Sequence, residues 1–186
     1  MRRSQESLRS HGAVVISIHW VTALLVLTAF LMAPEESEGR PGEELAGQFH
    51  EILGLTIFLL TLLRLVWKCF AATPALPSAP RWMELGSKVV QWTLYGLLLA
   101  TPLTAIAGVW LEGHALNLGV FGDIPPMVPK YPDAGESVTE IHTVMGDALI
   151  WLAGLHATAA LFHHFVLRDD VLLFMLPIRW LRKRLS

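Results

Sequence analysis

The sequence predicts an all-α integral membrane protein, a four-helix bundle with both termini on the cytoplasmic side. Hydrophobic residues make up 53% of the 186 residues and charged residues only 16%, which lies outside the usual range for soluble domains. Four apolar segments are long enough to cross about 30 Å of hydrocarbon at about 1.5 Å per residue. They use most of the chain, so we expect one transmembrane domain over residues 1–186.

The four predicted spans lie at about residues 13–33, 49–70, 87–111 and 140–167. The first is too long for a signal peptide, has no convincing cleavage site and carries a histidine, so we expect it to stay in the mature protein. The third contains Pro102 and no histidine, for which we predict a mild kink and a packing role. The connector at about 112–139 is rich in Pro, Gly and acids and lacks periodicity, which leaves no separate soluble domain.

Basic residues divide unevenly among the connectors. Of the 14 Lys and Arg residues, only Arg40 and Lys130 lie in the first and third connectors. The positive-inside rule therefore places both termini in the cytoplasm, which requires an even number of spans. The C-terminal WLRKRLS (180–186) suits an inner-leaflet anchor better than a nucleic-acid site because it follows a span, so we expect no nucleic-acid partner.

The outer connectors are acidic. Their carboxylates are Glu35, Glu36, Glu38, Glu43 and Glu44 in the first, and Glu112, Asp123, Asp133, Glu136 and Glu140 in the third. One interpretation is a solvated face that contributes little to orientation. The other is a surface that repels small anions and favours a basic partner.

Several kinds of site are excluded by residues that the chain lacks. Cys69 is the single cysteine, which excludes intrachain disulfides, CxxC redox or zinc sites and the CxxCH attachment of covalent haem. No glycine-rich phosphate loop or nucleotide fingerprint occurs.

Histidines within the spans are the strongest functional signal, because ionisable groups inside a bilayer are expensive and mark function. In the fourth span His142 and His156 are 14 residues apart, which at about 100° per residue brings them within roughly 40° of one face. Their axial separation is roughly 21 Å at about 1.5 Å per residue. The distance suits two stacked sites and is too large for one shared metal ion.

The other spans supply one partner at each level. The second span begins outside, so His50 lies level with His142 near the outer surface. The first begins inside, so His19 lies level with His156 near the cytoplasm. Topology alone thus predicts the pairs His50–His142 and His19–His156.

Two imidazoles at each of two levels suit non-covalent haem held axially between helices. Such ligation leaves no open iron position and favours electron transfer over oxygen binding. The alternative is a set of interhelical hydrogen bonds, or a proton or metal-ion pathway. Zinc usually takes a tetrahedral cluster at one depth, which these positions do not offer.

Three further residues are candidate binding residues. Arg64 lies 14 residues after His50, on nearly the same face, where it is a candidate partner for a haem propionate; snorkelling to lipid headgroups is the alternative. His163 and His164 lie toward the cytoplasm from His156, where they either contact a quinone headgroup or snorkel to the interface.

The chain resembles a bacterial cytochrome b561 of the short, four-helix, di-haem kind. The matching motifs are SIHW (17–20), FHEILG (49–54), LLRL (62–65), IHTVMGD (141–147) and GLHATAALFHHF (154–165). The resemblance implies a protein of the bacterial inner membrane with two b haems on the pairs given above, whose iron is bound by His19, His50, His142 and His156. It also implies quinone as the electron partner in the lipid phase.

Among such proteins are superoxide oxidases, and the resemblance implies that activity: superoxide oxidation coupled to ubiquinone reduction, an oxidoreductase reaction. A first alternative is an electron-transfer subunit that docks a dehydrogenase or another redox protein through the acidic connectors. A second alternative, of another class, is a histidine-lined proton or metal-ion transporter.

Overall fold

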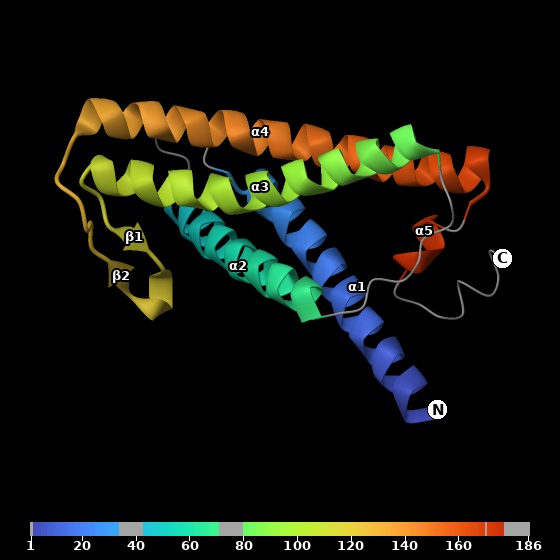
Figure 1. The fold of residues 1–186 in the computed structure, drawn as a ribbon. Coiled ribbons are helices and arrows are strands. Elements are labelled where there is room, and N and C mark those ends of the chain that lie inside the picture. Colours follow the sequence, from blue (N-terminus) through green and yellow to red (C-terminus); the bar gives the residue numbers. More distant parts are fainter. Residues whose placement is uncertain (1, 34–42, 71–79, 170, 177–186) are drawn as a thin grey trace.

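The computed structural model describes residues 2–33, 43–70, 80–169 and 171–176 and is dominated by four long helices (Figure 1). They are α1 (Arg2–Leu31), α2 (Glu43–Phe70), α3 (Arg81–Leu111) and α4 (Pro132–Phe162). A π-helix (His163–Leu167) continues α4, and the short helix α5 (Val171–Phe174) follows it. By length and composition these helices hold four candidate membrane spans, which confirms the predicted four-helix membrane protein.

The helices begin earlier in the chain than the predicted spans. Helix α2 begins at Glu43 instead of 49, α3 at Arg81 instead of 87, and α4 at Pro132 instead of 140. The span prediction counts apolar residues, whereas a helix continues into polar residues beyond the hydrocarbon. Proline at the first turn also suits the start of α4, because the first backbone N–H groups of a helix have no partner within it.

The connector between α3 and α4 contains a small antiparallel hairpin of β1 (Leu116–Asn117) and β2 (Asp123–Ile124). Its residues pair as Leu116 with Ile124 and Asn117 with Asp123, around a 3-10 turn at Gly119–Phe121. Strands of two residues are too short to produce a hydrophobic alternation, which is why the sequence contained no signal for them. We call this end of the bundle the hairpin end, and the opposite one the α5 end (Figure 1).

One buried residue from each long helix meets in the centre of the bundle. These are Ala29, Ile57, Leu98 and Leu149. Elsewhere the apolar side chains are largely exposed, and no more than 22% of any span window is buried within the protein. A surface this apolar requires lipid rather than water around it.

Helices α3 and α4 approach each other closely near the hairpin end, where they run side by side (Figure 1). A Cβ atom added to Gly108 would lie 2.5 Å from Oγ1 of Thr139 on α4. One added to Gly135 would lie 2.8 Å from the backbone nitrogen of Glu112. Thr139 Oγ1 also donates to Glu112 Oε1 at 2.8 Å. Glycine at these two positions therefore sets the distance between the helices.

At the α5 end the chain folds back onto α1. The indole N–H of Trp20 donates to the carbonyl of Met175 at 2.6 Å, and Leu173 of α5 is only 4% exposed. The basic tail 180–186 that we interpret as a membrane anchor lies outside the described residues, as do Glu35, Glu36, Glu38 and Arg40.

Candidate functional site

The structure brings the four histidines of the spans together as two pairs. At the hairpin end the imidazole of His50 on α2 faces His142 on α4, with ring centroids 6.0 Å apart and planes at 84°. Toward the α5 end His19 on α1 faces His156 on α4, with centroids 6.4 Å apart and planes at 86°. Helix α4 contributes one ring to each pair, so the two sites are stacked along one helix.

Backbone carbonyls orient the pair at the hairpin end. The Nδ1–H of His50 donates to the carbonyl of Ala29 on α1 at 2.8 Å, and the Nδ1–H of His142 donates to that of Thr101 on α3 at 2.8 Å. Because a carbonyl can only accept, both neutral rings carry their proton on Nδ1. Each Nε2 therefore keeps a free lone pair, as a metal ligand requires.

His19 has a different partner. The guanidinium of Arg64 donates through a terminal nitrogen to Nδ1 of His19 at 3.0 Å. Arginine has no acceptor, so Nδ1 of His19 must accept, and in the neutral ring the proton then lies on Nε2. Binding of a metal by Nε2 of His19 thus requires Arg64 to turn to another acceptor.

Both separations fit two imidazoles on opposite faces of one iron. A metal–imidazole bond is about 2 Å long and the nitrogen lies about 1.1 Å from its ring centre, so the centroids of an axial pair lie about 6.3 Å apart. The observed values of 6.0 and 6.4 Å agree with this distance. Among the described residues, no group of three or more His, Cys, Asp and Glu side chains could hold a metal ion instead.

Open glycine faces beside the pair at the hairpin end suit a flat macrocycle. Gly54 follows His50 by four residues and Gly146 follows His142 by four, so each lies one helical turn along the same face. A Cβ atom added to either glycine would meet no atom within 4 Å. The described residues therefore fit haem in shape as well as in ligand chemistry.

Comparison with known sequences identifies the family. A sequence model of prokaryotic cytochrome b561 matches residues 10–177, a range that includes all four paired histidines. The chain belongs to the prokaryotic cytochrome b561 family. It is therefore a membrane electron-transfer protein, and its family implies binding of haem b.

Three relatives of this cytochrome b561 cover nearly the whole chain. It is 30% identical over 174 residues to the probable superoxide oxidase CybB of Yersinia pestis, a match that covers 91% of this chain and 97% of that protein. It is 28% identical to cytochrome b561 homolog 1 of Escherichia coli, with 88% and 95% covered. It is 29% identical to cytochrome b562 of Cereibacter sphaeroides, with 88% and 93% covered.

The two remaining candidate histidines of this cytochrome b561 lie in the π-helix that continues α4. His163 follows His156 by seven residues, so it lies near the same face, about 10 Å further along the helix. Its Nδ1 lies 2.5 Å from Oδ2 of Asp169, and the backbone N–H of Asp169 donates to the carbonyl of His163 at 3.2 Å. His164 instead contacts Phe165, with ring centroids 4.9 Å apart. His163 and His164, which the sequence alone could not tell apart, thus have different partners in the structure.

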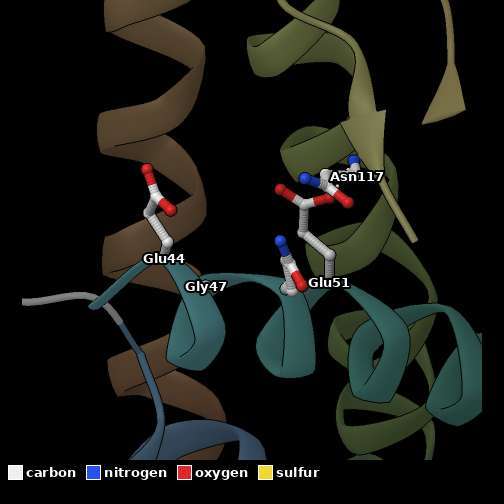
Figure 2. Close-up of a pocket in the computed structure, with 5 residues that line it drawn as sticks. Glu44, Gly47, Glu51 and Asn117 are labelled. Carbon is white, nitrogen blue, oxygen red and sulfur yellow. Dashed lines mark hydrogen bonds between the residues drawn. The ribbon is translucent and has the colours of Figure 1, made fainter. Parts of the chain in front are cut away.

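A pocket of about 280 Å³ lies between the first turns of α2 and strand β1 at the hairpin end (Figure 2). Its lining residues are Glu44, Gly47, Gln48, Glu51 and Asn117. Oε2 of Glu51 accepts a hydrogen bond from the backbone N–H of Asn117 at 2.7 Å, which fastens the hairpin to α2. Two carboxylates, Glu44 and Glu51, therefore line this pocket at the end of the bundle that holds the His50–His142 pair.

Sequence reasoning missed the carbonyls of Ala29 and Thr101. Every residue has a carbonyl, so no residue type marks the one that accepts from a ligand. The third helix, to which we assigned only packing, supplies one of these acceptors.

Proposed function

We propose that this member of the cytochrome b561 family is a di-haem electron-transfer protein of the bacterial inner membrane. His50 and His142 would bind one haem b, and His19 and His156 the other. This proposal rests on two imidazole pairs whose rings are separated by the distance expected for axial ligands, with α4 supplying one ring of each pair. Haem with two axial imidazoles supplies one-electron transfer without an open coordination position.

The orientation we propose places the α5 end in the cytoplasm. Basic residues in the described part of the chain gather toward that end, at Arg64, Lys68, Arg81, Lys88 and Arg168. Lys130 is the one described basic residue near the hairpin end. This asymmetry supports the orientation that the positive-inside rule predicts, in which the His50–His142 pair would lie near the outer surface.

Superoxide oxidation coupled to ubiquinone reduction is the specific activity we propose. Two superoxide anions would give up two electrons at the outer side and leave as two O₂ molecules. One ubiquinone would take up those electrons and two protons near the α5 end and leave as ubiquinol. Similarity to the probable superoxide oxidase of Yersinia pestis supports this assignment.

His163 and His164 would contact the quinone headgroup. His163 is the better placed of the two, because it continues the face of His156 and is backed by Asp169. A hydrogen-bonded imidazole at this position can orient a quinone carbonyl and hold a proton beside it. Lipid and quinone are then the expected partners within the membrane.

The carboxylates of the pocket at the hairpin end favour a second candidate donor. Glu44 and Glu51 lie on the pocket at the hairpin end, and a negative surface attracts a basic protein and repels an anion. This alternative would be identified if a basic redox protein reduces the cytochrome at a rate that falls steeply with added salt.

The first experiment measures haem. Visible spectra of oxidised and dithionite-reduced protein, with haem per chain, should show about two b haems in the wild type. His50→Ala and His142→Ala should remove one of them, and His156→Ala the other. His114→Ala is the matched control, since the His114 side chain is 69% exposed on the α3–α4 connector. A protein that binds no haem would overturn the proposal and leave the transporter as the better hypothesis.

The second experiment tests the reaction on protein that contains both haems. Superoxide should disappear faster only when ubiquinone is present, with ubiquinol and O₂ formed and no hydrogen peroxide from the catalysed reaction. Formation of hydrogen peroxide without ubiquinol would indicate dismutation and overturn the superoxide oxidase assignment.

A further inference from the structure

Two basic side chains of α2 converge on one aromatic ring of α3. Arg64 and Lys68 are four residues apart and therefore share a helix face. Arg64 Cζ lies 5.5 Å and Lys68 Nζ lies 5.4 Å from the ring centroid of Tyr95, which is only 5% exposed. A fixed, buried ring thus holds two positive charges close together.

Among the described residues, the contacts of these two cations are with neutral groups. Lys68 Nζ donates to Oε1 of Gln91 at 3.3 Å and lies 5.0 Å from the Trp92 ring centroid. Arg64 donates to His19, and its Nε is buried without a hydrogen-bond partner. Within the part of the chain that the structure describes, neither cation is paired with a carboxylate.

This arrangement is incomplete without an anion. Partly buried charges are costly unless a group of opposite charge accompanies them, and two like charges near one ring also repel each other. Cation–π contacts and an amide offset part of this cost but do not neutralise it. Two acidic groups, or one group with two negative charges, would complete the site.

We propose that Arg64 and Lys68 together bind the two propionate groups of the haem held by His19 and His156. The inference rests on the proposed function, because it requires a haem at that pair. It goes beyond the role of Arg64 by assigning Lys68 as the second anchor and Tyr95 as the residue that positions both. Arg64 already touches His19, so the anchors lie beside this ligand pair.

The site also supplies the acceptor that Arg64 requires. A propionate oxygen accepts from a guanidinium more strongly than a neutral imidazole does, since both partners of that hydrogen bond are charged. Arg64 can then release Nδ1 of His19, which frees Nε2 of that ring for the iron. Lys68, one turn nearer the α5 end, is left to pair with the second propionate.

The test compares Lys68→Met with Lys88→Met in purified protein that contains both haems. Lys88 is an exposed lysine of α3 at the same end of the bundle, so its loss controls for net charge. Transfer of haem to an excess of apomyoglobin should become about tenfold faster for one haem in Lys68→Met and stay unchanged in Lys88→Met. The midpoint potential of the same haem should fall, because a nearby positive charge favours the reduced state. Lys68→Arg should restore both properties.

Two results would overturn the inference. One is a Lys68→Met protein whose haem transfer and potentials match those of Lys88→Met. The other is an effect that occurs only in nanodiscs containing phosphatidylglycerol and is absent with neutral lipid, which would assign Lys68 to a lipid headgroup phosphate. Circular dichroism establishes that each variant is folded. Absence of haem from the wild type would defeat the proposed function, whereas two haems with an unaffected Lys68→Met would defeat this inference alone.

Discussion

The Nδ1–H of His142 on α4 donates to the carbonyl of Thr101 on α3, immediately before Pro102. This hydrogen bond gives the one long helix without a paired histidine a part in the site. The orientation of His142, a proposed haem ligand, therefore depends on the direction of the Thr101 carbonyl. The equivalent acceptor for His50 comes from Ala29 of α1, so the two helices that carry neither ring of the His50–His142 pair, α1 and α3, orient its imidazoles.

Pro102→Ala should weaken haem binding at the hairpin end alone. Alanine supplies the N–H that proline lacks, so the turn of α3 that carries Thr101 can form its hydrogen bond to Leu98 and tighten. Misdirection of the Thr101 carbonyl should cost about 0.5–1.5 kcal/mol, or a two- to tenfold faster loss of one haem. The rate of haem transfer to apomyoglobin measures this loss. Leu103→Ala, at a neighbouring exposed position, is the control. Equal effects on both haems would contradict this coupling.

Valine at Gly54 or Gly146 should exclude the haem at the hairpin end while leaving the bundle folded. Neither position has a neighbour within 4 Å of an added Cβ, so the new side chain disturbs no protein contact but projects beside a histidine pair. Gly96→Val is the matched control, because Gly96 of α3 is equally open but lies on a helix without a paired histidine. We expect about one haem per chain in the first two variants and two in the control. Two haems in all three would show that these faces do not border the cofactor.

Glycine at 135 should matter for stability instead. An alanine Cβ there would lie 2.8 Å from the backbone nitrogen of Glu112, which cannot move without shifting α3. Overpacking of this kind costs about 1–3 kcal/mol, so Gly135→Ala should lower the thermal midpoint. Gly86→Ala, which meets no atom within 4 Å, should leave the midpoint unchanged or raise it. A Gly135→Ala protein as stable as Gly86→Ala would contradict the tight contact between α3 and α4.

The two kinds of glycine show how far the sequence could predict this molecule. Span length and charge bias predicted four helices. The 14-residue interval between His142 and His156, together with the topology, predicted which histidines meet, because the face and depth of a residue follow from helix geometry. Sequence could not distinguish Gly135, which packs helices, from Gly146, which is open, since the distinction depends on the residues of the neighbouring helix. The contact of Lys68 with Tyr95 was unpredictable for the same reason.

His163→Ala should slow quinone reduction without removing haem. The imidazole is held by Asp169 at 2.5 Å and lies on the face that carries His156, so its loss removes an oriented hydrogen-bond partner for a quinone carbonyl. We expect an approximately tenfold slower reoxidation of reduced protein by ubiquinone-1, with unchanged haem spectra. His164→Ala, which removes a ring in edge-on contact with Phe165, should have a smaller effect. Equal rates for His163→Ala and the wild type would place the quinone elsewhere.

Neutralising Glu44 and Glu51 together should distinguish the two candidate donors by the sign of the effect. Glutamine at 51 keeps an oxygen that can accept from the Asn117 N–H, and the two substitutions together remove both negative charges from the pocket at the hairpin end. An anionic donor such as superoxide should then react about two- to tenfold faster, and a basic protein donor correspondingly slower, because the local field changes the encounter rate. Either change should diminish in 0.5 M salt, where screening acts within a few ångströms. Glu84→Gln, at an exposed carboxylate in the first turn of α3 at the α5 end, should alter neither rate. Turnover of superoxide that becomes faster in the variant would favour the superoxide oxidase, and reduction by a basic protein that becomes slower, without turnover of superoxide, would favour a docking partner.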